Sequence, residues 1–174
     1  VMIAMALICK PALLIADEPT TALDVTTQAH ILELLRDLAA ETGTAMVYVS
    51  HDMGAIARVS DRIAVMYGGE LVLEGPARRV LKQPAHPYAR GLLMSIPRIK
   101  EAVMPASMPG QPPAPGGAGQ GCAFVDRCPM AEQRCRDERP ALVPTAVEEL
   151  VRCHFHERIE RLPPPEPPKR PSRP

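Results

Sequence analysis

Blocks of apolar and polar residues alternate over residues 12–73, and their lengths predict strands and helices in turn. Residues 12–16 form a short, continuous apolar run, which is typical of a parallel strand that is buried on both faces. Residues 45–49 form a second run of the same kind. Between these runs, Gly43 ends a helix whose apolar residues recur at helical spacing, namely Ile31, Leu34, Leu35 and Leu38.

Two further elements follow the second apolar run. Residues 53–59 predict a short helix that has Asp52 as its N-cap. The runs 63–67 and 71–73 flank Gly68-Gly69-Glu70, and this pattern predicts a β-hairpin. Because strands alternate with helices, we expect an α/β fold built on a parallel sheet, in which ligands bind at the carboxyl ends of the strands.

A change of composition near Ile99 separates this part from the rest of the chain. Fifteen of the 21 prolines lie from Pro105 onward, and residues 104–121 are dominated by Pro, Gly and Ala, as in a linker. We therefore predict four parts, which are an α/β part over 1–99, a Pro/Gly-rich linker over 100–121, a Cys-rich extension over 122–160 and a disordered Pro-rich tail over 161–174.

The bulk charge and the longest apolar run exclude several classes of protein. Twenty basic and 20 acidic side chains cancel, so the charge does not favour nucleic acid or anionic lipid as a partner. The longest apolar run, residues 1–9, is too short to span a bilayer and lacks the pattern of a signal peptide. This run opens inside a helical pattern without an N-cap residue, which we interpret as the start of a truncated or excised fragment.

Charged and polar residues that suit phosphate chemistry follow the two apolar runs. Asp17 and Glu18 end the first run, and Ser50 and His51 end the second. Asp17 suits a magnesium ion that is bound through its waters. Glu18 suits the role of orienting and deprotonating an attacking water, and His51 can donate a hydrogen bond to a transferring phosphoryl oxygen.

Each of these residues also has a purely structural interpretation. Acidic residues favour the helix N-termini that follow strands, so Asp17 and Glu18 fit that role without any catalysis. By itself His51 fits a loop histidine with its hydrogen bonds satisfied, and Asp24 fits a helix N-cap. Their combination favours the catalytic interpretation over these alternatives.

Three segments resemble the motifs of ABC-type ATPases in order and spacing. Residues 13–20, Leu-Leu-Ile-Ala-Asp-Glu-Pro-Thr, resemble the Walker B segment of that family. Residues 21–24, Thr-Ala-Leu-Asp, resemble its D-loop, and residues 49–52, Val-Ser-His-Asp, resemble its switch-histidine loop. The resemblance implies a partial P-loop NTPase sheet with helices, in which residues 1–11 correspond to the helix after the ABC signature motif.

Other segments narrow the resemblance to one subfamily. Residues 83–93 resemble a segment typical of importers of oligopeptides, dipeptides and nickel. Residues 121–131 and 151–154 resemble the C-terminal extension of the same subfamily. The resemblance implies the ATP-binding and ATP-hydrolysing subunit of a peptide importer, whereas the alternative is a non-catalytic remnant or a metal-bearing structural or interaction module.

The resemblance also implies roles, cofactors and partners. Glu18 would polarise the hydrolytic water, Asp17 would serve Mg²⁺, and His51 would sense the γ-phosphate of ATP. Asp24 would communicate across a dimer in which each ATP lies between two ATPase subunits. The implied partners are the second ATPase subunit, two transmembrane permease subunits and, indirectly, an extracytoplasmic peptide-binding protein, which together imply a peripheral location at the cytoplasmic face of the plasma membrane.

Three motifs of the family are missing from this chain. It contains no Gly-x-x-x-x-Gly-Lys-Ser/Thr loop, no Leu-Ser-Gly-Gly-Gln signature and no Gln-containing loop of the kind that contacts the permease. Phosphoryl transfer depends on positioning and on charge neutralisation, and the phosphate-binding loop supplies much of both. We therefore predict that this chain alone neither binds ATP tightly nor hydrolyses it.

Four of the five cysteines fall in the predicted extension. Cys122, Cys128, Cys135 and Cys153 have the spacing C-x5-C-x6-C-x17-C, without the close C-x2-C pairs of zinc ribbons. Four thiolates suit a 4Fe–4S cluster, which some members of the resembled subfamily carry. Zinc and reduced, packed thiols remain alternatives, and His154 or His156 could replace a ligand. Cys9 is expected to be a small core residue.

Overall fold

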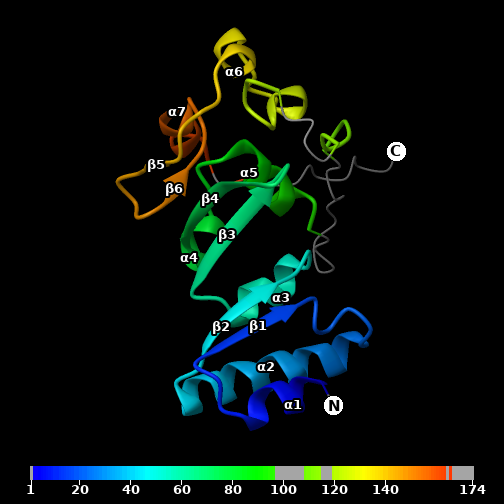
Figure 1. Cartoon of the computed structure of the whole chain (residues 1–174). Coiled ribbons are helices and arrows are strands. Elements are labelled where there is room, and N and C mark those ends of the chain that lie inside the picture. The colour runs from blue at the N-terminus through cyan, green and yellow to red at the C-terminus, as the bar shows by residue number, and fades with distance from the viewer. Residues whose placement is uncertain (1, 97–107, 115–118, 164, 166–174) are drawn as a thin grey trace, which may run out of the picture. The chain divides into compact units, whose positions relative to one another are not determined.

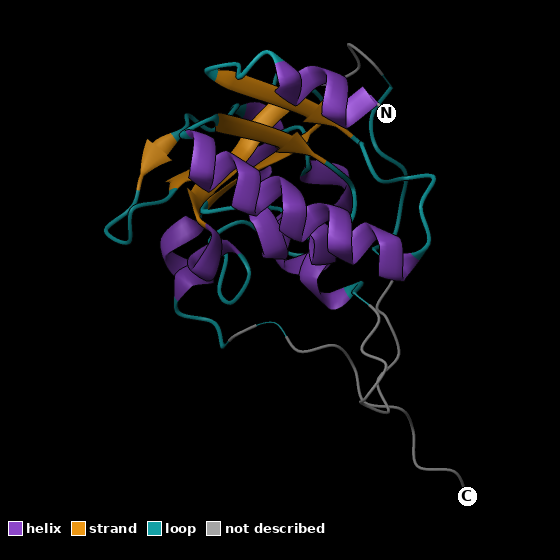
Figure 2. Ribbon diagram, turned by 90° about the horizontal axis from the view of Figure 1, so that it is seen from below, coloured by secondary structure: helices purple, strands orange, loops and turns teal. Residues whose placement is uncertain are grey.

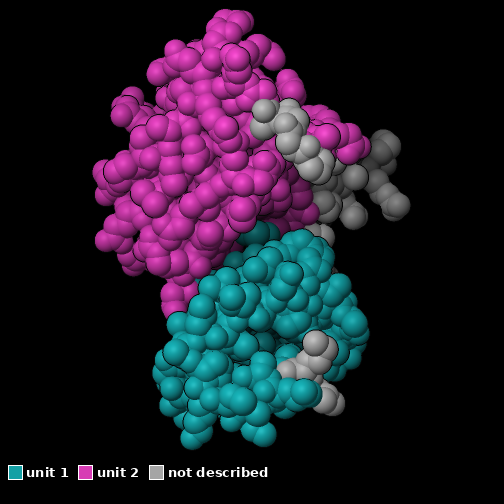
Figure 3. Space-filling view, viewed as in Figure 1, with its two compact units in different colours: residues 1–60 teal, residues 61–174 magenta. Residues whose placement is uncertain are grey.

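The computed structural model describes residues 2–96, 108–114, 119–163 and 165, and the chain divides into two compact units. The first unit comprises residues 1–60 and the second comprises residues 61–174, as Figure 3 shows in two colours. Both units combine helices with strands, so the predicted mixed α/β class is confirmed at that level. Among the described residues, no helix combines the length and the apolar character needed to cross a membrane.

The first unit is a two-stranded parallel sheet with helices (Figures 1 and 2). Strands β1 and β2 pair in register, with Leu13 opposite Ala45 and Asp17 opposite Val49. Leu14 and Ala16 are buried on one face of β1, and Leu32 and Leu35 are the buried residues of α2. The elements of this unit are α1 (Met2–Ile8), β1 (Leu13–Asp17), α2 (Val25–Thr42), β2 (Ala45–Val49) and α3 (Met53–Val59).

Helix α2 begins and ends where the sequence predicts. The Asp24 side chain accepts hydrogen bonds from the backbone amides of Thr26 and Thr27, which satisfies donors that the first turn of a helix leaves open. Gly43 follows the last turn with φ of 68°, a left-handed conformation that glycine adopts without steric cost. Asp52 caps α3 in the same way, through the amide of Gly54.

The prediction that both strands are buried on both faces is wrong. Leu13 is 51% exposed and Ile15 is 67% exposed, and on β2 Val47 and Val49 are 48% and 47% exposed. Parallel pairing puts Ile15 opposite Val47, so these side chains share one face. An apolar run indicates that a strand is compatible with burial on both faces. It does not show whether other elements cover both faces of that strand.

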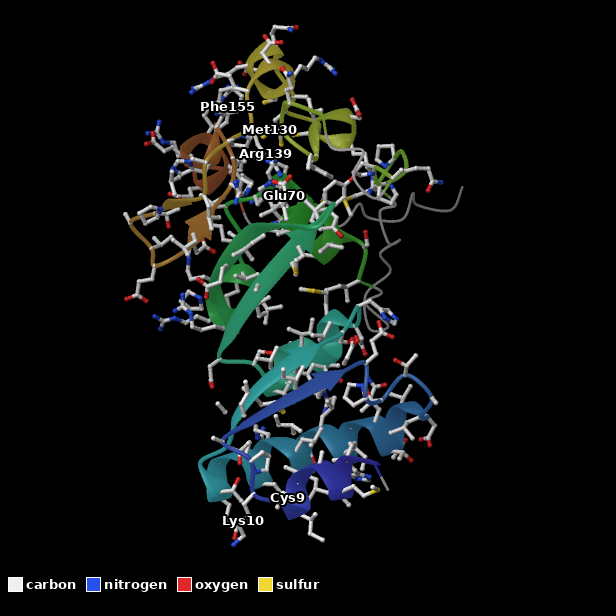
Figure 4. All side chains as sticks on the ribbon, in the orientation of Figure 1. Cys9, Lys10, Glu70, Met130, Arg139 and Phe155 are labelled. Carbon is white, nitrogen blue, oxygen red and sulfur yellow. The ribbon has the colours of Figure 1, made fainter. Side chains whose placement is uncertain are left out.

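The interpretation of Cys9 as a core residue is also wrong. Helix α1 ends at Ile8, and Cys9 lies in the turn beyond it with its side chain exposed (Figure 4). The apolar pattern continues one residue beyond the helix, to Cys9. The helix ends earlier because Pro11 disfavours a helical conformation at the residue before it. The pattern therefore predicted the helix correctly but not its last residue.

The second unit contains an antiparallel sheet in the strand order β3-β4-β6-β5. The predicted hairpin is confirmed: Gly68 and Gly69, with φ of 57° and 81°, form the two-residue turn between its strands. The sequence patterns did not predict strands β5 and β6, because each is only two residues long and shows no alternation. The elements are β3 (Arg62–Tyr67), β4 (Glu70–Pro76), α4 (Ala77–Val80), α5 (Pro87–Met94), η1 (Val125–Arg127), α6 (Gln133–Asp137), β5 (Val143–Pro144), β6 (Leu150–Val151) and α7 (His156–Glu160).

Three of the few aromatic side chains pack together in the second unit. The ring centroid of Tyr67 lies 4.7 Å from that of Tyr88 and 5.1 Å from that of Phe124. Phe124 is 2% exposed, and Val151 and Ile159 are fully buried.

Glu70 on β4 also pairs with Arg139 (Figure 4) and lies 3.6 Å from Arg152. Segments from residue 122 onward are thus packed against the β3–β4 hairpin.

Candidate active site

The parallel pairing of β1 and β2 brings their carboxyl ends to one edge of the sheet. The amide of Glu18 donates to the carbonyl oxygen of Val49 over 2.9 Å, which extends the pairing by one step beyond Asp17. His51 follows β2 by two residues. Glu18 and His51 therefore follow neighbouring strands at the same edge of the sheet.

Glu18 and His51 are in direct contact. Nδ1 of His51 lies 2.6 Å from Oε1 of Glu18, although both side chains are partly open to solvent, at 75% and 41% exposure respectively. Because an ionised carboxylate only accepts, Nδ1 carries the hydrogen in this bond. The bond lowers the pKa of Glu18 below its usual value and raises the pKa of His51 above its usual value.

This contact determines what the second ring nitrogen of His51 can do. Neutral imidazole with its hydrogen on Nδ1 offers only an acceptor at Nε2, whereas the doubly protonated ring donates from both nitrogens. The raised pKa of His51 favours the doubly protonated form. The pair is therefore suited to hold a carboxylate with one nitrogen and to donate to an anionic oxygen with the other.

The backbone of Glu18 is in an uncommon conformation. Its φ is 43°, in the left-handed region, where a residue with a Cβ costs about 1–2 kcal/mol. The Val49 carbonyl holds the Glu18 amide, and the Thr21 amide donates to the Glu18 carbonyl over 3.4 Å. Such conformations gather at functional sites, since the surrounding structure must hold them in place.

The loop that carries His51 is fixed by side-chain hydrogen bonds. The amide of Asp52 donates to Oγ of Ser50 over 3.0 Å. Nε2 of Gln28 on α2 donates to Oδ2 of Asp52 over 2.9 Å, which ties this loop to the long helix. The bond between Ser50 and Asp52 closes the loop around His51, and helix α2 restrains it through Gln28.

Asp24 is the N-cap of helix α2. Its Oδ1 accepts from the amides of Thr26 and Thr27, and its Oδ2 accepts from the Thr27 hydroxyl over 2.7 Å. These bonds lower the pKa of Asp24, the Thr27 hydroxyl most of all. The signalling role across a dimer stays a prediction.

Asp17 ends β1 with an exposed side chain on the same face as Leu13 and Ile15. A single carboxylate suits Mg²⁺, because this ion keeps several waters and binds the phosphates of a substrate. In the part of the chain that the structure describes, no three His, Cys, Asp or Glu side chains form a group that could hold a metal ion. The donor present therefore fits magnesium delivered with a nucleotide rather than a cage made by the protein alone.

Thr21 belongs to the site, although no role was predicted for it beyond its place in the segment that resembles the D-loop. Its hydroxyl lies 2.9 Å from Oε2 of Glu18 and 3.2 Å from the Glu18 carbonyl oxygen. A threonine three residues after an acid in a turn is a signal for such a bond, because hydroxyl side chains bond locally in turns.

The four cysteines of the second unit line one small cavity. Cys122, Cys128, Cys135 and Cys153 share it with residues that include Met130 and Phe155, which Figure 4 labels. Burial raises the pKa of the Cys122 and Cys128 thiols, and it raises the pKa of Cys153 to about 12. All four are free thiols, and His154 lines the same cavity.

A family model described as the C-terminal region of oligopeptide/dipeptide transporters matches residues 73–135. The match begins within β4, ends at Cys135 and includes the segment around Pro87 that resembles the peptide-importer subfamily.

Individual relatives give the same result. The chain is 49% identical to the oligopeptide transport ATP-binding protein OppD of Salmonella typhimurium over 141 residues, which are 80% of this chain and 42% of that protein. It is 46% identical to the dipeptide transport ATP-binding protein DppD of Escherichia coli over 158 residues, 89% of this chain and 48% of that protein. It is 43% identical to the oligopeptide transport ATP-binding protein AppD of Bacillus subtilis, over 90% of this chain and 48% of that protein. The chain thus spans about half the length of these relatives.

Proposed function

We propose that this chain is part of the ATP-hydrolysing subunit of an ABC-type importer of oligopeptides or dipeptides. The observation that carries the proposal is the 2.6 Å contact between Glu18 and His51 at adjacent ends of two parallel strands. The names of the relatives, which assign them ATP binding and peptide transport, support the same activity and substrate class.

The site residues divide the work of hydrolysis among them. ATP with Mg²⁺ supplies the phosphoryl group and part of the charge that stabilises the transition state. Hydrogen bonds from His51 and Thr21 hold the pKa of Glu18 below its usual value, and the ionised carboxylate can orient a water and accept its proton. His51, held by Glu18 at Nδ1, would donate from Nε2 to a phosphoryl oxygen, and Asp17 would hold magnesium.

The partners follow from the same proposal. Leu23 and Val25 flank Asp24 and are 38% and 84% exposed, which supports a contact between this turn and a second ATPase subunit. We further propose two permease subunits at the membrane and, through them, an extracytoplasmic peptide-binding protein. The subunit would work at the cytoplasmic face of the plasma membrane, and its sheet would be part of a P-loop NTPase fold.

A second proposal concerns the extension. The four cysteines that line one cavity have the donor chemistry of a 4Fe–4S cluster. In the described part of the chain these cysteines do not form a group that could hold a single metal ion. A cluster is larger than one ion, so its four thiolates need not converge on one point as they do around zinc. Cysteine residues 122, 128, 135 and 153 would hold it, and it would stabilise a segment that has few apolar residues of its own.

A chimera tests the proposed ATPase activity. The 158 residues of the E. coli relative that match would be replaced by the corresponding residues of this chain. We expect magnesium-dependent ATP hydrolysis, which Glu18→Gln lowers by about 100-fold or more, because the water loses its base. Glu33→Gln, on the exposed surface of α2, serves as the matched control and should leave the rate unchanged.

Two outcomes of this assay would overturn the proposal. One is a folded chimera that hydrolyses no ATP. The other is a Glu18→Gln chimera that hydrolyses ATP as fast as the Glu33→Gln control.

A further inference from the structure

Both oxygens of the Glu18 carboxylate are engaged within the chain. Oε1 contacts Nδ1 of His51 at 2.6 Å, and Oε2 accepts from the hydroxyl of Thr21 at 2.9 Å. The Glu18 carbonyl oxygen is a second acceptor for the same hydroxyl at 3.2 Å. A hydroxyl has one proton to donate, and the carboxylate oxygen is both nearer and charged, so it is the stronger acceptor.

Contacts of the neighbouring residue Thr20 restrain the turn that carries Thr21. Its neighbour Thr20 is 4% exposed and its hydroxyl lies 3.0 Å from the phenol oxygen of Tyr48 on β2. The amide of Leu23 donates to the Thr20 carbonyl over 3.0 Å, which closes the turn. The buried anchor at Thr20 holds the turn against the sheet, and the Thr21 hydroxyl is thereby presented to Glu18 from a fixed point.

We propose that Thr21 is a positioning residue for Glu18. Its hydroxyl restrains the rotation of the carboxylate so that Oε1 stays within hydrogen-bond distance of His51. A carboxylate held by one contact alone can rotate about its terminal torsion, which is broad, whereas two contacts at its two oxygens fix its plane. The catalytic consequence of this restraint rests on the proposed function, but the restraint itself does not.

The first test reads the effect of Thr21 at His51, in this chain alone. The ring nitrogen signals of His51 would be recorded by NMR at constant pH. Thr21→Val removes the hydroxyl at nearly constant shape, and we expect the signals to shift from their wild-type positions toward those of Glu18→Gln. Thr21→Ser keeps the hydroxyl, and its signals should stay close to the wild-type positions.

A matched control separates positioning from a general effect on the turn. Thr27 also donates its hydroxyl to an acid three residues before it, namely Asp24. Thr27→Val should therefore leave the His51 signals unchanged. The inference is overturned if Thr21→Val leaves the His51 signals unchanged, or if Thr27→Val shifts them by as much. Amide spectra check that each variant is folded, and Thr21→Ala gives a second variant without a hydroxyl if Thr21→Val does not fold.

The second test uses the chimera described above. Thr21→Val should lower kcat by about tenfold and leave KM for ATP unchanged, because the misplaced group acts on the attacking water and not on nucleotide binding. Thr21→Ser should restore most of kcat. If Glu18→Gln fails to affect hydrolysis, the proposed function fails, whereas the response of His51 to Thr21→Val still decides the positioning role.

Discussion

At the scale of single residues, the pKa values of two glutamates, Glu18 and Glu149, are shifted in opposite directions. Glu18 is partly exposed, contacts an imidazole and a hydroxyl, and has a lowered pKa. Glu149 is 1% exposed, and neither of its carboxylate oxygens has a hydrogen-bond partner within the described part of the chain. Burial raises the pKa of Glu149 to about 7, with a nearby Arg79 opposing and Glu160 adding to this effect.

Replacing Glu149 by glutamine should stabilise the chain at alkaline pH. A carboxyl group whose pKa is raised on folding stabilises the folded state below its unfolded pKa, and this contribution is lost as the pH rises through the folded value of about 7. We expect Glu149→Gln to be more stable than wild type by about 2 kcal/mol at about pH 8, and close to wild type at about pH 5. Urea unfolding at both pH values measures this, and an equal difference at the two values would contradict the assignment.

At the scale of the elements, the ends of helices and turns are determined by local chemistry. Asp24, Gly43 and Asp52 occupy the capping positions that their side chains or backbones suit. The pair Gly68-Gly69 makes the turn of the hairpin for the same kind of reason. Such short-range signals need no knowledge of the rest of the fold.

The cap at Asp24 gives a prediction at this scale. Asp24→Ala removes three acceptor contacts at the start of α2 and should lower the free energy of unfolding by about 1 kcal/mol. Asp37→Ala, on the exposed surface of the same helix, should change it by less than about 0.5 kcal/mol. Urea unfolding compares the two. Equal losses for both variants would show that the cap contributes nothing beyond the helix surface.

The predictable part of the fold is the part that local patterns specify. Helices α2 and α3 and strands β1 to β4 follow from periodicity, capping and glycine placement. Strands β5 and β6 do not, because two-residue strands such as Val143–Pro144 have no period to detect. They form only by pairing, β6 with β4 and β5 with β6. Of the site, Asp17, Glu18 and His51 could be named from their places after apolar runs, but Thr21 could not be assigned its contact.

At the scale of the whole molecule, the extension contributes to the second sheet. Strand β6 pairs with β4, with Leu73 opposite Val151. Phe124 from the extension completes the ring cluster with Tyr67 and Tyr88. The four cysteines line a cavity beside this core, so anything bound there would join segments that lie far apart in the sequence.

Iron loading tests the proposed cluster at this scale. Anaerobic reconstitution with iron and sulfide should give visible absorbance and raise the thermal unfolding temperature, since a ligand that binds only the folded state stabilises it. Cys153→Ser should reduce both effects, whereas Cys9→Ser, a cysteine outside the cavity, should not. A protein that stays colourless after reconstitution would remove the cluster and leave four packed thiols.

The sequence by itself indicated phosphate chemistry and predicted the positions of most of the elements. An acid pair after one apolar run and a histidine after the next favoured that chemistry, because both follow predicted parallel strands, at whose carboxyl ends ligands bind. Only the tertiary structure decided that Glu18 and His51 touch, that Thr21 holds the other carboxylate oxygen, and that one face of β1 and β2 is exposed. Distances between side chains and the covering of a sheet face depend on how distant segments meet, and no local pattern of residues encodes that.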